Sequence, residues 1–284
     1  MKFFLIILLS SFSFTNQMSI ISGGNLEKFS LMNGRSFIDN IINNDNSLLT
    51  ASFIQYPEQI NISEIMFNSY FKNYLIQSKV SILNFGTFTE TQSNEDINQF
   101  KVSEKNIQLS IVDKSSSGFL FGSSIGYAWS KIDNYISKHI VHSIGCRKSL
   151  MKNRLHLGAS LENIIYAIEE FSNINQSYTT HTNIGITYTP EHLDAKLHIN
   201  YLYKNHTDSE FIVSVKNTIN DNFTIYAGKS IYLNHMSLDN QYAFYDNFAC
   251  GVNIIKSRHQ YNMGVQYLGD IGVIFGSSLT VLIK

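Results

Sequence analysis

The sequence has few residues of several kinds, and each scarcity excludes a class of protein. Among 284 residues there are two cysteines and two prolines. A small disulfide scaffold would need more cysteines, and a disordered chain would carry more prolines and fewer than the observed 44% hydrophobic residues. Charged residues make up only 15% of the chain, and 21 basic side chains nearly cancel 22 acidic ones. This balance removes the electrostatic reason to expect nucleic acid as a partner.

Long hydrophobic runs are also missing. The mean hydropathy is −0.06, and beyond the N-terminus no apolar run approaches the roughly 20 residues that a spanning helix needs. A bundle of membrane helices is therefore excluded. Two classes remain, namely a soluble β-rich protein and a membrane β-barrel.

The N-terminus predicts export. Lys2 precedes an apolar stretch over residues 3–9, and small polar residues follow over 10–15. This order is typical of a secretory signal peptide, which we place at residues 1–17. In residues 18–46 the apolar side chains are spaced more like a short helix or two than like strands. We expect this segment to form a plug or a periplasmic segment.

The strongest pattern in residues 47–284 is alternation with period two, which is typical of strands. Tyr261, Met263 and Val265, for example, alternate with polar or small residues. Turn-forming residues separate such segments at short intervals. We predict about fourteen strands, most of them near the 9–11 residues that cross an outer membrane at a tilt. Their expected centres lie near residues 52, 66, 81, 107, 125, 141, 159, 183, 199, 213, 227, 248, 263 and 278.

An all-β transmembrane antiparallel barrel explains this pattern better than a secreted β-sandwich, which stays open as an alternative. The polar faces consist of Gly, Ser, Thr, Asn and His rather than Lys and Glu, as suits a narrow lumen. Several aromatic residues fall close to predicted strand ends, as in the interfacial girdles of such barrels. These are Phe53, Tyr56, Phe85, Tyr135, Tyr188, Tyr203 and Tyr267.

The residues that carry chemistry form no recognisable constellation. The sequence holds no motif of a hydrolase, a metalloprotease or a nucleotide-binding protein. His139 and His142 should point to opposite faces of a strand, which makes them poor partners for a metal ion. Cys146 and Cys250 lie in predicted strands, and we favour buried thiols over a disulfide. Residues 161–171 could be helical instead of extended. We expect neither catalysis nor a cofactor.

Two segments carry a resemblance to a known family. Residues 83–91 (LNFGTFTET) and 98–102 (NQFKV), which lead into a strand at 106–112, resemble the hallmark hairpin of the PorV/PorQ family. Residues 262–272 (NMGVQYLGDIG) are similar to that family's closing hairpin. The similarity extends over most of the chain after about residue 47 and is greatest to the PorQ branch.

The resemblance implies a fourteen-stranded outer-membrane barrel with the architecture of FadL fatty-acid transporters. It implies a non-enzymatic role in type IX-like protein secretion and surface attachment, in a Gram-negative cell envelope. The partners would be outer-membrane lipid and other secretion-system proteins or secreted cargo. We expect a partner-binding loop between residues 85 and 100, with Phe85, Gly86, Phe88, Glu90 and Phe100 as its candidate residues. A FadL-like channel for hydrophobic small molecules is the alternative function.

Overall fold

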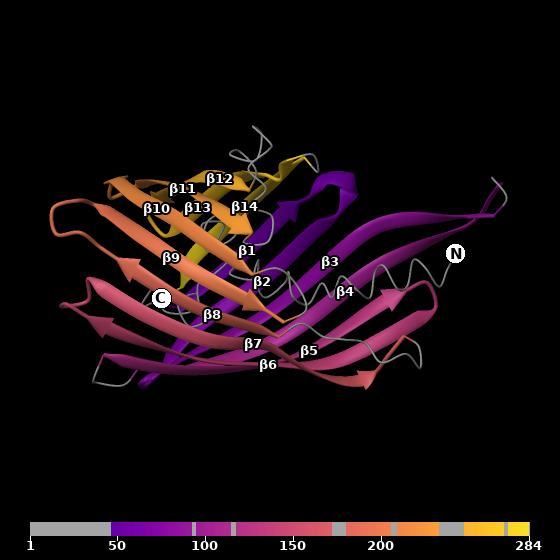
Figure 1. The fold of residues 1–284 in the computed structure, drawn as a ribbon, viewed down its shortest axis with the longest axis horizontal. Helices are drawn as coiled ribbons and strands as arrows, with labels where there is room; N and C mark the ends of the chain where they lie inside the picture. Colours follow the sequence, from indigo (N-terminus) through magenta and orange to yellow (C-terminus); the bar gives the residue numbers. More distant parts are fainter. Residues whose placement is uncertain are drawn as a thin grey trace.

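The computed structural model describes residues 47–92, 95–114, 118–171, 180–205, 209–232, 247–269 and 272–283. The predicted signal peptide (1–17) and plug (18–46) lie outside the described residues. Fourteen strands form one closed barrel in which each strand is antiparallel to its neighbours (Figure 1). The first strand pairs with the last, from Ser47 opposite Ile283 to Gln55 opposite Phe275.

The strands follow one another around the barrel in sequence order. Their bounds are β1 (Ser47–Gln55), β2 (Asn61–Phe71), β3 (Tyr74–Gln92), β4 (Glu95–Lys114), β5 (Phe119–Ile132), β6 (Tyr135–Leu150), β7 (Leu155–Glu169), β8 (His181–Tyr188), β9 (Ala195–Lys204), β10 (Glu210–Asn220), β11 (Phe223–Tyr232), β12 (Phe248–Lys256), β13 (His259–Tyr267) and β14 (Val273–Ile283). A single 3₁₀ turn, η1 (Pro57–Gln59), connects β1 to β2. No helix among these residues is long and apolar enough to cross a membrane.

The predicted all-β barrel is confirmed, and each of the fourteen expected strand centres falls within a different strand. The closed order of strands rules out the β-sandwich alternative. The helical alternative for residues 161–171 is wrong, because β7 stays extended to Glu169 and pairs with β6 along this stretch, and with β8 as far as Glu162. Cross-strand pairing outweighs the helix propensity of a stretch that contains three Glu residues.

The barrel has an apolar outer face and a polar inner face. On β13, Tyr261, Met263 and Val265 are exposed, whereas Asn262 and Gln266 between them are buried in the interior. The same alternation recurs on the other strands. Since closure pairs the backbone of every strand on both edges, an apolar exterior of this kind suits the hydrocarbon of a bilayer.

The two ends of the barrel differ in the length of their connections. At the end that holds both the start of β1 and the end of β14, two of the turns join Phe71 to Tyr74 and Lys256 to His259. We call this the short-turn end. At the opposite, long-loop end, the connections include those from Glu169 to His181 and from Tyr232 to Phe248. In outer-membrane barrels the short turns face the periplasm and the long loops face outward.

Most of the aromatic residues expected near strand ends are exposed there, but two are not. Phe53, Tyr135, Tyr188, Tyr203 and Tyr267 are exposed. The remaining two, Tyr56 and Phe85, belong to an interior cluster. Phe85 falls on an inward position of β3, and Tyr56 lies in the connection that folds back over the barrel end.

The two cysteines also differ from their prediction. Both thiols are free, as favoured, but neither is fully buried. Cys146 is paired with Phe121 and Cys250 with Val265, and both of these partners are exposed on the outer face. Cross-strand partners share a face, so the thiols face outward.

Candidate functional site: the barrel interior

An apolar cluster lines the inside of the barrel at the long-loop end, and we call it the mouth cluster. It gathers buried side chains from neighbouring strands together with residues of three connections. Its members are Ile54, Ile62, Leu83, Phe85, Val102, Ile132 and Ile274, with Tyr56, Ile60, Phe88, Phe100, Phe171 and Leu268 packed against them. An apolar lining at this position differs from the polar, water-filled interior of a general porin.

The connection between β1 and β2 is held over the mouth cluster by hydrogen bonds. The Gln55 side-chain amide donates to the carbonyls of Tyr56 and Ile60, at 2.8 and 3.1 Å. The backbone N–H of Tyr56 donates to the carbonyl of Ile60 at 2.9 Å. Burial here raises the pKa of the Tyr56 phenol, so this group stays neutral. Tyr56 and Ile60, which pack against the mouth cluster, are therefore held in a fixed turn by neutral groups.

The predicted partner-binding loop is instead a continuation of the β3–β4 hairpin, which extends beyond the neighbouring strands (Figure 1). Its aromatic residues face the barrel mouth: Phe85 is only 6% exposed, and Phe88 and Phe100 pack against the mouth cluster. The Phe88 and Phe100 rings stack at 5.7 Å. Glu90 pairs with Asn98 in the same hairpin.

A bulge at Gly86 explains how these rings reach the same side. The register shifts between Asn84 and Thr87, so that Phe85 and Gly86 together face Val102. Gly86 has a φ of +85°, and its N–H donates to the side-chain oxygen of Asn84 at 3.0 Å. Only glycine adopts such a φ without strain. The extra residue shifts the alternation by one, which turns Phe88 inward.

The barrel interior also holds buried charged residues, each on an inward position. They are Glu64, Lys79, Glu104, Glu162 and Glu210. Buried charges persist in proteins only with hydrogen-bonded or charged neighbours. We call these five side chains the luminal belt.

Three of the belt carboxylates share one local arrangement, in which a serine hydroxyl donates to the glutamate. Ser130 donates to Glu104 at 3.2 Å, Ser160 donates to Glu162, and Ser230 donates to Glu210. A neutral donor stabilises each carboxylate without adding a second charge to the lumen.

Lys79 connects distant parts of this belt. It is 3% exposed, and its ammonium group interacts electrostatically with the carboxylates of Glu64 and Glu162. Glu64 lies on β2, next to the strand of Lys79, whereas Glu162 lies on β7, four strands away around the barrel. The interaction therefore spans the lumen.

Close-packed contacts keep some luminal side chains against the wall. The Tyr226 ring lies over Gly251 of the neighbouring strand, and its hydroxyl donates to the carbonyl of Met263 at 3.0 Å. The Asn200 side chain likewise lies against Gly185. Glycine at these inward positions leaves room for a ring or an amide beside the backbone.

The two histidines considered for a metal site both lie on β6 and point to opposite faces of the sheet, as predicted. His139 is buried in the lumen, where its Nε2 lies 3.0 Å from the Ser137 hydroxyl. His142 is paired with outward-facing Ile125, so it faces the other way. No group of three His, Cys, Asp or Glu residues in the described ranges could hold a metal ion.

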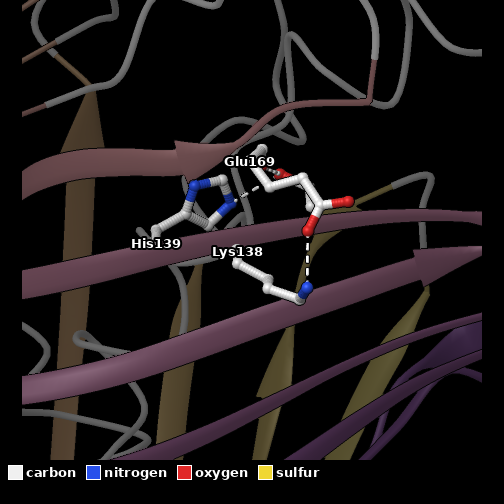
Figure 2. A network of polar contacts seen from close by, with 4 residues as sticks. Lys138, His139 and Glu169 are labelled. Atoms are coloured by element: carbon white, nitrogen blue, oxygen red, sulfur yellow. Dashed lines mark hydrogen bonds and ion pairs between the residues drawn. The ribbon is translucent and has the colours of Figure 1, made fainter.

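Two exposed ion pairs flank the spanning part of the barrel. Figure 2 shows Lys138 on β6 extending to Glu169 on β7, with 2.5 Å between Nζ and Oε2, beside His139. At the short-turn end, Arg154 donates to Glu191, which lowers the pKa of that carboxyl and raises the pKa of the guanidinium. Exposed pairs of this kind contribute little to stability.

The sequence pattern missed the arrangement of the barrel interior. It identified Phe85, Phe88 and Phe100 but placed them on an exposed loop, and it did not single out any belt carboxylate. A signal was present, because Glu104 and Glu162 each occupy the polar side of an alternating segment. A charged residue on the luminal side of a barrel strand is a functional candidate.

With this geometry described, the fold can be compared with known structures. The TodX toluene transporter of P. putida is similar with a TM-score of 0.55 and 8% identity, covering 85% of this chain and 91% of TodX. Two TodX mutants, described as monoaromatic hydrocarbon channels, each have a TM-score of 0.54. Their identities to this chain are 9% for the deltaS2S3 mutant and 7% for the deltaS2 mutant.

The sequence itself gives no further relative: no protein-family model and no curated protein matches it. At identities this low the likeness to TodX shows the fold alone. The chain is a closed fourteen-stranded antiparallel barrel that shares its fold with the outer-membrane barrel TodX.

Proposed function

We propose that this protein is an outer-membrane channel that takes up small hydrophobic molecules. The observation that carries the proposal is the mouth cluster, a buried cluster of apolar side chains inside the barrel at the end where outer-membrane barrels face outward. A hydrophobic solute gains free energy by leaving water for such a cluster.

The fold supports the same function. TodX, which shares the architecture, is described as a toluene transporter. A barrel for hydrophilic solutes would instead place polar groups at the mouth. The absence of catalytic motifs from the sequence agrees with a channel.

Uptake by whole cells tests this function. Cells that lack the protein should take up toluene more slowly than complemented cells, while uptake of glucose should not change. Leu83→Asn places a polar side chain in the mouth cluster and should lower toluene uptake about tenfold, as expected when a buried leucine's transfer free energy is lost. Ile82→Ala changes the adjacent residue, which faces outward, and should preserve uptake. Equal toluene uptake with and without the protein would rule out the channel.

A role in type IX-like secretion and surface attachment is the second candidate. One observation favours it: the β3–β4 hairpin extends past its neighbours, since β2 pairs with β3 only as far as Asn84 and β5 pairs with β4 only from Val102. The hairpin edges beyond those positions could pair with an extended segment of a partner. Phe85 is buried and therefore unsuited to that contact.

Shortening the hairpin separates the two functions. Replacing residues 87–100 by a tight turn should leave barrel assembly intact, as judged by heat-modifiable migration. A secretion component would then lose surface proteins from the cell, whereas a channel would retain them and change only in uptake of hydrophobic solutes.

A further inference from the structure

One belt carboxylate lies directly beneath the mouth cluster. Glu104 is on β4, two residues from Val102 on the same inward face, and its cross-strand partner on β3 is Leu83. Both neighbours belong to the mouth cluster. Glu104 itself is 5% exposed. A molecule seated among the apolar side chains would therefore meet this carboxyl group at its inner end.

The Glu104 carboxyl group is only half satisfied. One oxygen, Oε2, accepts the hydrogen bond from Ser130 at 3.2 Å. The other, Oε1, is buried and has no hydrogen-bond partner among the described residues. A buried acceptor without a donor is energetically unfavourable, which makes it a good place for a ligand that brings one.

Two further oxygens nearby are also buried without a hydrogen-bond partner among the described residues. Asn106 occupies the next inward position on β4, and Ser81 is its cross-strand partner on β3. The Asn106 Oδ1 and Ser81 Oγ atoms are buried, and neither has a hydrogen-bond partner among the described residues. The inner wall below the mouth cluster thus presents three polar atoms that lack donors.

This chemistry discriminates between classes of hydrophobic ligand. An ammonium group has three N–H donors, no acceptor and a positive charge, which suits an acceptor-rich wall with a carboxylate. A carboxylate ligand offers only acceptors and has the same charge as an ionised Glu104. A neutral alcohol, with one O–H donor and no charge, should suit this wall less well than an ammonium group and better than a carboxylate.

We propose that the channel prefers hydrophobic amines in their protonated form, with the hydrocarbon part in the mouth cluster and the ammonium group on Glu104. The proposal rests on the proposed function, because it names the substrate class of the same entry site. Asn106 and Ser81 supply secondary acceptors on the adjoining wall.

Matched probes with one six-carbon chain test the preference. Binding of hexylamine, hexanol and hexanoate to the purified full chain in neutral detergent is measured by calorimetry at pH 7. The expected order of affinity is hexylamine, then hexanol, then hexanoate. Glu104→Gln should lower hexylamine affinity about tenfold, the size expected for a charge-assisted hydrogen bond, and should leave hexanol affinity unchanged.

Glu210→Gln is the matched control. Glu210 is also 5% exposed and also accepts a hydrogen bond from a serine, Ser230, but it lies on β10 and outside the mouth cluster. This variant should keep the wild-type order of affinities. Heat-modifiable migration confirms that both variants are folded, and Ser81→Ala, which removes a single hydroxyl, should weaken hexylamine binding by a smaller factor.

The outcomes separate this inference from the function on which it rests. If hexanol and hexylamine bind equally, or if Glu104→Gln leaves hexylamine binding unchanged, the amine preference is overturned and the hydrophobic channel remains. If none of the three probes binds, and toluene uptake is also independent of the protein, both proposals fail.

Discussion

Tyr226 occupies the space that a side chain at Gly251 would need. A Cβ atom built on Gly251 would lie 2.5 Å from two carbons of the Tyr226 ring and 2.5 Å from the carbonyl oxygen of Met263. The Tyr226 hydroxyl donates to that same carbonyl. The ring is thus fixed by a glycine beneath it and a hydrogen bond at its tip.

Gly251→Ala should therefore destabilise the barrel by about 1–3 kcal/mol, the usual cost of overpacking. The clash involves backbone and a fixed ring, so it cannot be relieved by a simple rotation. Thermal unfolding followed by heat-modifiable migration measures the loss. Gly185→Ala is the control: its new Cβ would meet the end of the Asn200 side chain, which can rotate away, so the loss should be smaller. Equal losses would show that the Tyr226 ring is not fixed.

Removal of Lys79 should affect both stability and conduction. Lys79→Met removes the buried positive charge that interacts electrostatically with the carboxylates of Glu64 and Glu162, so the variant should be less stable than the wild type. The lumen also becomes more negative, so the reversal potential in planar bilayers should shift toward higher cation selectivity. Lys105→Met, an exposed outward position on β4, is the control and should change neither property. An unchanged selectivity in Lys79→Met would exclude a place for Lys79 on the conduction path.

The two thiols offer a direct test of the outer face. Cys146 and Cys250 are free and share their face with exposed apolar residues. In reconstituted vesicles we expect a charged, membrane-impermeant maleimide to label neither thiol until the protein is denatured, because a thiol in lipid stays protonated and out of the reagent's reach. The Cys146→Ala and Cys250→Ala variants assign the signal to each position. Rapid labelling by the charged reagent would show that water, rather than lipid, covers this face.

Alternation with period two was enough to predict the fourteen strands and the apolar and polar faces of the segments in which it is regular. That pattern is local, so it is readable without knowledge of the partners. The extended hairpin was missed for a physical reason: the bulge at Gly86 interrupts the alternation, and beyond it β3 and β4 pair only with each other. Local propensity gives no account of a strand stabilised in this way.

The contacts between luminal side chains could not be predicted from the sequence for a different reason. Lys79 and Glu162 are separated by 83 positions in the printed sequence, and their interaction exists only because the sheet closes on itself. Likewise, the unsatisfied oxygen of Glu104 depends on which neighbours the register brings beside it. The pattern predicts that such residues face inward, but not which groups they meet.

A charge on the outer face should be costly if lipid covers it. Met263 is near the middle of β13 and is 50% exposed on that face. Met263→Arg should destabilise the folded barrel by about 2–4 kcal/mol when the residue lies near the bilayer midplane. Met263→Leu keeps the apolar surface and should be nearly neutral. Denaturant titration in lipid vesicles measures both variants. Equal stability of the two would mean that water surrounds the outer face, and the apolar exterior of every strand would then need another partner.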